Sequence, residues 1–297
     1  IESNIHYPTN NSLVWDCIKE SHRLFMQLKQ EMANVEYRDY TTTAKRTYFK
    51  INNTKSSDKR INLFKQQLIT FTKCINQVSN VIKKKSCCSV EAYYILLDME
   101  KHLPVMQQVY AMTEKKQIKD EVVPNDEKLF SIYEQHTDII VKGSRKVEFG
   151  HKINLSSGKS NLIMSCEVLR GSPSDKDLYQ PTVDKVISDY KIVPRDIATD
   201  GGYASKLNAA YAQGKGIVNI VFNKVVGSLQ NIVSGLNIET RLKKWRSGIE
   251  ANISNLKRGF NIERCNWKGF EHFCSKVMWS VIAYNIRVMT GAVLQRI

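Results

Sequence analysis

Two carboxylates in the C-terminal half of the chain have neighbours suited to phosphate chemistry. Asp200 follows the hydrophobic run 192–199 and precedes two glycines, so its carboxylate should lie at a strand end with space for a ligand. Glu250 has Arg246 one helical turn before it and Lys257 two turns after it. Carboxylates at such positions can hold divalent cations, which activate an attacking oxygen and stabilise a leaving oxygen at a phosphodiester.

Each carboxylate also has a plainer interpretation. An Asp before Gly-Gly is an ordinary turn-forming residue, and Arg246 with Glu250 forms the i,i+4 pair typical of a solvated helix face. The two interpretations differ in geometry. A shared metal site requires the carboxyl groups of Asp200 and Glu250 to lie roughly 4–8 Å apart, and a separation above about 12 Å would exclude it.

The elements that must position these residues can be read from the hydrophobic spacing. Residues 241–260 form a helix at the border of a core, because five apolar residues fall on one side of it: Leu242, Ile249, Ile253, Leu256 and Phe260. Residues 270–289 have a wide apolar face and are predicted to be a buried helix. Four strands are expected to lie in one sheet, with a hairpin joining the first two: 147–155, 162–169, 192–199 and 217–222.

The region from Leu13 to Lys119 is predicted to be almost wholly helical, with Ser12 as its N-cap. Apolar residues recur there at a spacing near 3.5 residues, as in Ile61, Phe64, Leu68, Phe71, Ile75, Val78 and Ile82. No Gly- or Pro-rich linker separates this region from its flanks, so it is interpreted as an insertion. Residues 1–11 alternate like a strand and break at Pro8.

The chain of 297 residues has a net charge of +15, which favours a polyanionic partner. Basic positions proposed as DNA contacts are His151, Lys152, Lys243, Lys83, Lys84 and Lys85, although a solvated face explains each of them equally well. Seven cysteines without a CxxC pair indicate a reducing compartment and no structural zinc site. No run of 18 apolar residues is present, so no membrane span is expected.

Four segments together resemble a bacterial insertion-sequence transposase of the DDE class, ISNCY type. They read ESNIHYPT at 2–9, EFGHK at 148–152, ATDGGYAS at 198–205 and WRSGIEANISNLKRGF at 245–260. Related transposases carry a Tyr-x-x-Arg-x-x-x-Glu-x-x-x-x-x-x-Lys signature on their last catalytic helix. Arg246, Glu250 and Lys257 match it, whereas Lys243 stands in place of the Tyr.

The resemblance implies an α/β fold, an RNase H-like mixed sheet flanked by helices. Residues 1–11 and 120–297 would form the catalytic domain, and residues 12–119 an all-helical insertion after the first strand. Asp200 and Glu250 would be the second and third acidic residues and would hold two Mg²⁺ or Mn²⁺ ions. The first Asp is expected before residue 1, so this fragment should be inactive. Asp16 is a poor substitute, because it lies past Pro8 in the helical region.

The implied function is metal-dependent cleavage of transposon ends and strand transfer to a target, with double-stranded DNA as the partner. A homodimer or larger assembly on DNA in the bacterial cytoplasm is expected. Two alternatives stay open: a related nuclease without strand transfer, and a DNA-binding relic that has lost its chemistry. Metal-dependent nicking of plasmid DNA separates an enzyme from a relic, and a joined product separates a transposase from a nuclease.

Overall fold

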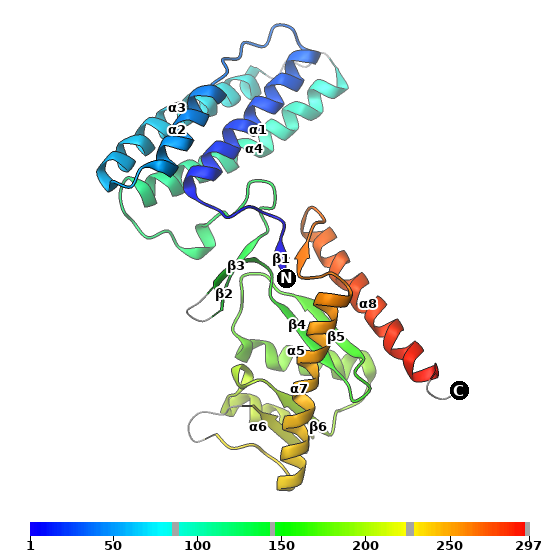
Figure 1. The fold of residues 1–297 in the computed structure, drawn as a ribbon. Coiled ribbons are helices and arrows are strands. Elements are labelled where there is room, and N and C mark those ends of the chain that lie inside the picture. The colour runs from blue at the N-terminus through cyan, green and yellow to red at the C-terminus, as the bar shows by residue number, and fades with distance from the viewer. Residues whose placement is uncertain (85–88, 143–145, 224–228, 295–297) are drawn as a thin grey trace. The chain divides into compact units, whose positions relative to one another are not determined.

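The protein is described here by a computed structural model that covers residues 1–84, 89–142, 146–223 and 229–294. The chain divides into two compact units, drawn as a ribbon in Figure 1. One unit comprises residues 5–137, and the other comprises residues 1–4 together with residues 138–297. Lys85, one of the predicted DNA contacts, lies outside the described residues.

The unit of residues 5–137 contains four α-helices that pack side by side (Figure 1). They are α1 (Asn10–Glu31), α2 (Thr41–Asn53), α3 (Ser57–Lys84) and α4 (Val90–Gln117), followed by the short 3-10 helix η1 (Asn125–Glu127). The prediction of a helical region is confirmed. The first N-cap is Thr9 rather than Ser12, because the Thr9 hydroxyl accepts from the Ser12 amide and the Ser12 hydroxyl accepts from the Thr9 amide.

The core of the helical unit is formed by the apolar faces of its helices. In α3 the predicted stripe is buried, since Phe64, Phe71 and Val78 are at most 1% exposed. A polar joint is buried beside it. Asn11 of α1 donates to the Tyr48 carbonyl at 2.9 Å and accepts from Gln67 at 2.6 Å. These bonds fix α2 and α3 against α1, because breaking them would leave buried polar groups unpaired.

The second unit contains eight strands in three sheets. A four-stranded sheet has the order β2-β3-β1-β8, with β1 (Glu2–Ser3), β2 (Asp138–Lys142), β3 (Lys146–Gly150) and β8 (Arg264–Cys265). The antiparallel hairpin β4–β5 (Ile153–Ser157 and Ile163–Val168) is the predicted one. The parallel pair β6–β7 (Asp196–Thr199 and Asn219–Phe222) forms the third sheet.

The prediction that four strands lie in one sheet is therefore wrong for the described residues. One cause is Gly150, where the predicted strand 147–155 is divided into β3 and β4. The backbone of Ile1 and Glu2 passes so close to Gly150 that a Cβ there would overlap the Ile1 carbonyl. The other cause is that no described strand lies between β4–β5 and β6–β7 to join them.

Helices cover these sheets and supply their cores. α5 (Asp175–Tyr190) and α6 (Lys206–Gly214) pack with β7 through Tyr179, Ala212 and Phe222, all at most 2% exposed. The remaining helices are the 3-10 helix η2 (Gly201–Tyr203), α7 (Leu236–Gly259) and α8 (Phe270–Leu294). All four residues of β7 are buried, as predicted for this strand.

The expectation of a buried helix at 270–289 is only half right. Phe273 and Val277 of α8 are 1% exposed, whereas Trp279 is 63% and Ile286 is 54% exposed. Among the described helices, α8 is the one with the length and hydropathy to cross a membrane. Core helices of soluble proteins can have the same length and hydropathy.

Candidate active site

Asp200 stands at the junction between β6 and the 3-10 helix η2. It is the N-cap of η2, and its Oδ1 accepts from the Gly201 amide at 2.8 Å. The parallel pairing of β6 with β7 brings the strand to this point, where both strands end. Asp200 therefore caps the turn, as the plainer interpretation predicts, through its Oδ1 atom. Its Oδ2 atom can bind other partners.

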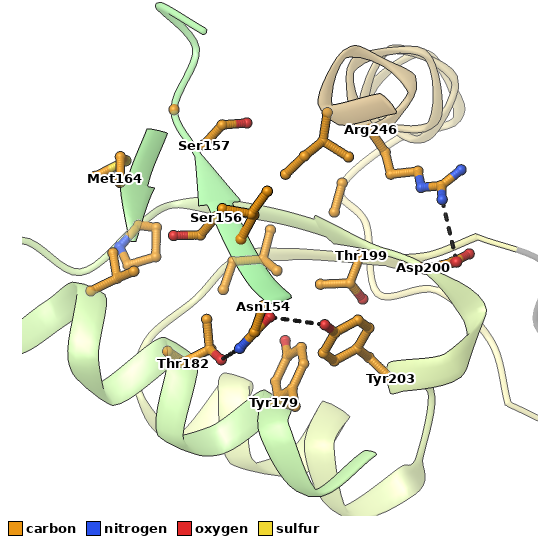
Figure 2. A pocket seen from close by; sticks show the side chains of 18 of the residues that line it. Asn154, Ser156, Ser157, Met164, Tyr179, Thr182, Thr199, Asp200, Tyr203 and Arg246 are labelled. Carbon is orange, nitrogen blue, oxygen red and sulfur yellow. Dashed lines mark hydrogen bonds and ion pairs between the residues drawn. The ribbon is translucent and has the colours of Figure 1, made fainter. Parts of the chain in front are cut away.

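Glu250 lies on α7, one turn after Arg246, and the two side chains form an i,i+4 pair. Arg246 Nη1 lies 2.9 Å from Glu250 Oε1, and Arg246 Nη2 lies 3.3 Å from Asp200 Oδ2. Figure 2 shows Arg246 reaching from its helix to Asp200. A single guanidinium thus joins two carboxylates that are fifty residues apart in the sequence.

The shared guanidinium limits how far apart the two carboxylates are. Its terminal nitrogens are about 2.3 Å apart in a rigid plane, so Asp200 Oδ2 and Glu250 Oε1 lie within about 8.5 Å of each other. This is below the limit of about 12 Å at which a two-ion site is excluded. Both carboxylates are open to solvent, with 56% and 62% of their side chains exposed. A ligand can therefore reach them.

Beside this pair lies a cavity of about 470 Å³. It is bounded by β4 on one side, by β6 and Asp200 on another, by α5, and by α7 (Figure 2). The α7 residues that border it include Trp245, Ile249 and Ile253, which belong to the predicted apolar side of that helix. Three hydroxyl groups lining it have no hydrogen-bond partner among the described residues: Ser156, Tyr179 and Thr199.

Polar contacts tie one end of β4 to the residues just after Asp200. Asn154 donates to the Thr182 hydroxyl at 2.6 Å and accepts from the Tyr203 hydroxyl at 3.0 Å (Figure 2). Burial, together with the negative charges of Asp175 and Asp200, raises the pKa of Tyr203 to about 12. Tyr203 therefore stays protonated and acts as a hydrogen-bond donor at neutral pH.

Asp175 is a site residue that the sequence did not single out. It lies in the first turn of α5, lines the same cavity, and packs so closely against Gly202 that an added Cβ would lie 2.6 Å from its Oδ2. The second glycine after Asp200 thus makes room for another carboxylate. The signal in the sequence was the pattern Ser-Pro-Ser-Asp at a helix start, which reads equally well as a helix cap.

The other basic residues predicted on α7 lie away from the carboxylates. Lys243 Nζ bonds Glu239 Oε1 at 2.7 Å, so it forms a second i,i+4 pair near the start of the helix. Lys257 is half-buried and lies two turns after Glu250, which is about 10 Å along the helix axis. The functions of Lys243 and Lys257 remain predictions.

The prediction that His151 contacts DNA is wrong. Its side chain is fully buried, Nδ1 lies 3.0 Å from the Leu169 carbonyl, and the ring packs edge-on against Phe270 and Phe273. A phosphate cannot reach an imidazole enclosed in this way. Its neighbour Lys152 is half-buried.

The segment that carries both candidate carboxylates matches a known protein family. The family of the transposase DDE domain matches residues 118–286, more than half of the chain. The chain belongs to this family. The DDE match begins directly after α4 and includes both Asp200 and Glu250. No curated protein and no solved structure matches the chain.

Membership in the DDE family identifies a transposition enzyme in general and DNA as its substrate. Among the described residues no three His, Cys, Asp or Glu side chains gather in a way that could hold a metal ion.

Proposed function

We propose that this protein cleaves the ends of a transposon and transfers them to target DNA, using Asp200 and Glu250 as two of its three acidic ligands. The observation that carries the proposal is the bridge by Arg246, which holds these carboxylates within about 8.5 Å of each other at an open site. If Arg246 and Glu250 formed only an ion pair on a solvated helix face, Arg246 would not also contact Asp200 at the end of β6.

The donor set suits Mg²⁺ or Mn²⁺, since both ions prefer carboxylate oxygens. Asp200 and Glu250 would hold them, and the bound ions would supply activation of the attacking oxygen and stabilisation of the leaving oxygen. Arg246 keeps the two carboxylates oriented when no cation is bound. It also lowers their mutual repulsion, because its charge is shared between them.

We also propose that the second unit has an RNase H-like arrangement, in which a central strand fills the cavity between β4 and β6. The hydrogen-bonding pattern supports this idea. The Leu169 amide donates to the Lys152 carbonyl, so the backbone groups of Lys152 point toward β5. Successive residues of a strand point their backbone N–H and C=O groups to opposite sides, so those of Ile153 and Leu155 point away from β5. The Asn223 amide bonds the Thr199 carbonyl on the β7 side, so Ala198 directs its backbone groups toward the cavity.

The start of the chain supplies a register for that strand. The Ile1 amine donates to the His151 carbonyl at 2.9 Å, and the His151 amide donates to the Ile1 carbonyl at 3.0 Å. A strand that lies beside β4 in the same antiparallel register would pair with Ile153 and then Leu155.

The face of β4 that holds Ile153 and Leu155 is the one that carries Glu250. Ile153 and Leu155 pack with residues of α7, α8 and β5, whereas Asn154 contacts α5 on the opposite face. We therefore propose that a third acidic ligand would reach Asp200 and Glu250 from this face, on a strand that pairs with Ile153 and Leu155 and joins the separate sheets into one.

Two measurements on the full-length protein test these proposals. Metal-dependent nicking of supercoiled plasmid DNA, followed by detection of a joined product, tests the chemistry. Hydrogen exchange tests the strand: the Leu155 and Ala198 amides should exchange slowly if a strand pairs with both β4 and β6. Cleavage without this protection would disprove the strand, and protection without cleavage would favour a DNA-binding relic.

The remaining features of the site are proposals of the same kind. The match that begins at residue 118 supports the division into a catalytic domain of residues 1–11 and 120–297 and a helical insertion of residues 12–119. We propose the ISNCY type of insertion-sequence transposase, acting in the bacterial cytoplasm as a homodimer or larger assembly on DNA. Mass measurement of the complex with a transposon end tests the assembly.

A further inference from the structure

The positive charge of the helical unit is concentrated on α2 and α3. Residues 41–84 contain ten Lys or Arg residues and a single acidic residue, Asp58. By contrast, α1 contains three basic and three acidic residues, and α4 contains three basic and four acidic residues. The hairpin of α2 and α3 thus carries a strong local charge that the composition of the whole chain conceals.

The cations of α3 lie on its outer side. At about 100° per residue, five lysines fall opposite the buried stripe of Phe64, Phe71 and Val78; they are Lys59, Lys65, Lys73, Lys83 and Lys84, and each is exposed. On α2 the buried residues are Ala44 and Ile51. Its exposed outer side carries Lys45, Arg46 and Lys50 around the half-exposed Phe49.

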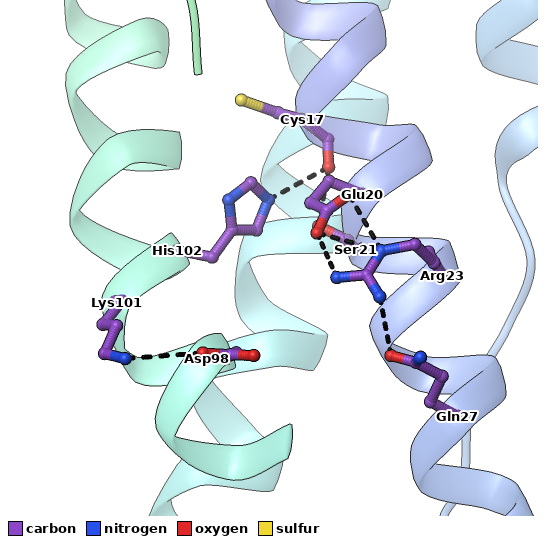
Figure 3. Close-up of polar contacts among 8 residues, drawn as sticks. All are labelled: Cys17, Glu20, Ser21, Arg23, Gln27, Asp98, Lys101 and His102. Atoms are coloured by element: carbon purple, nitrogen blue, oxygen red, sulfur yellow. Dashed lines mark hydrogen bonds and ion pairs between the residues drawn. The ribbon is translucent and has the colours of Figure 1, made fainter. Parts of the chain in front are cut away.

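The described cations of α2 and α3 have no carboxylate partner, whereas several cations on the neighbouring helices do. On α1 and α4, Arg23 pairs with Glu20, and Lys101 lies 3.5 Å from Asp98 (Figure 3). No ion pair joins any Lys or Arg of α2 or α3 to an acidic group within the part of the chain that the structure describes. Unpaired like charges repel one another, so this surface is stabilised when a polyanion neutralises it.

The charged surface is also rigid and long. The joint of Asn11 and Gln67 fixes α2 and α3 against α1, and the 28 residues of α3 extend for about 42 Å. A phosphate backbone offers charges at a regular spacing over such a length, with about one charge per 1.7 Å of duplex. A short acidic loop of another protein does not reach across the whole helix.

We propose that the outer face of α2 and α3 binds the phosphate backbone of duplex DNA without reading its sequence. This adds a DNA contact that is separate from the carboxylate site, and it rests on the proposed function only in taking DNA as the polyanion. Lys83 and Lys84 are among the DNA contacts that the sequence predicts. The surface has only isolated exposed apolar residues, such as Phe49 and Ile69, which favours DNA over a lipid surface.

The salt dependence of binding to a 30-base-pair duplex of arbitrary sequence tests the proposal in the whole chain. The variant Lys59→Gln, Lys65→Gln, Lys73→Gln should shallow the slope of log K against log salt by up to about 2.7, since each lost phosphate contact changes it by about 0.9. The matched control replaces three paired lysines of the same unit by Gln: Lys101, Lys115 and Lys119. It removes the same charge and should leave the slope nearly unchanged.

A triple Lys→Arg variant at the three α3 positions should keep the full slope, because it keeps the positive charge at each position. An unchanged slope in the Gln variant, or an equal change in the control, would overturn the proposal. So would a Gln variant that loses binding to phosphatidylserine vesicles while its DNA slope stays the same. The variant Asp200→Asn should keep the full slope, so failure of the catalytic proposal and failure of this one give different results.

Discussion

Arg246 is the residue whose removal most directly tests the arrangement of the site. Its side chain is 15% exposed, whereas its partners Asp200 and Glu250 are 56% and 62% exposed. Exposed ion pairs contribute about 0–1 kcal/mol each, so Arg246→Ala should cost the fold roughly 1 kcal/mol and lower the melting temperature by about 2–4 °C. The effect on function should be larger. Residues that orient metal ligands typically change metal affinity or activity 10–100-fold when they are lost.

The assay combines two readouts on the full-length protein: Mn²⁺ binding by titration calorimetry and the rate of plasmid nicking. Both should fall about 10–100-fold in Arg246→Ala. Arg241→Ala is the matched control, because Arg241 lies on the same helix and pairs with Asp196 of β6 at 3.3 Å without touching Asp200. If the control loses as much activity, or if Arg246→Ala binds Mn²⁺ normally, the bridge does not organise the site.

Three further outcomes follow from the same geometry. Asp200→Asn or Glu250→Gln should abolish nicking while leaving DNA affinity within about twofold, because each removes a metal ligand and not a phosphate contact; an unchanged nicking rate would remove that residue from the site. Lys257→Ala should weaken DNA binding and only reduce the rate, which gel-shift and nicking assays measure together. Gly202→Ala should destabilise the fold by about 1–3 kcal/mol, since its Cβ would meet the Asp175 carboxylate at 2.6 Å, and urea unfolding at an unchanged midpoint would contradict this.

The sequence predicted the elements better than it predicted how they join. Hydrophobic spacing located the four-helix region, the hairpin of β4 and β5, and the helix that carries Glu250, because each depends on contacts close in sequence. Hydrophobic spacing and composition identify strands but do not show which strands pair, so the prediction of a single sheet was wrong. Composition does not reveal that the Ile1 backbone crosses Gly150.

The sequence suggested Asp200 and Glu250 as a pair but not the means of holding them. The sequence predicts that Arg246 pairs with Glu250 on one helix, whereas the ion pair of Arg246 with Asp200 depends on how α7 packs against β6. His151 shows the opposite error. A His-Lys pair on a strand suggested an exposed contact, but aromatic residues of α8, more than one hundred positions later, enclose the ring.

The position of β1 between β3 and β8 determines the order in which this protein can fold during synthesis. Glu2 pairs with Gly150 on one side and with Arg264 on the other. At a synthesis rate of about 5–20 residues per second, the first strand waits roughly 13–50 s for its last partner to leave the ribosome. The helical unit, whose contacts lie within residues 5–137, can close during that interval. The sheet of β2, β3, β1 and β8 is therefore completed late, after β8 has been synthesised.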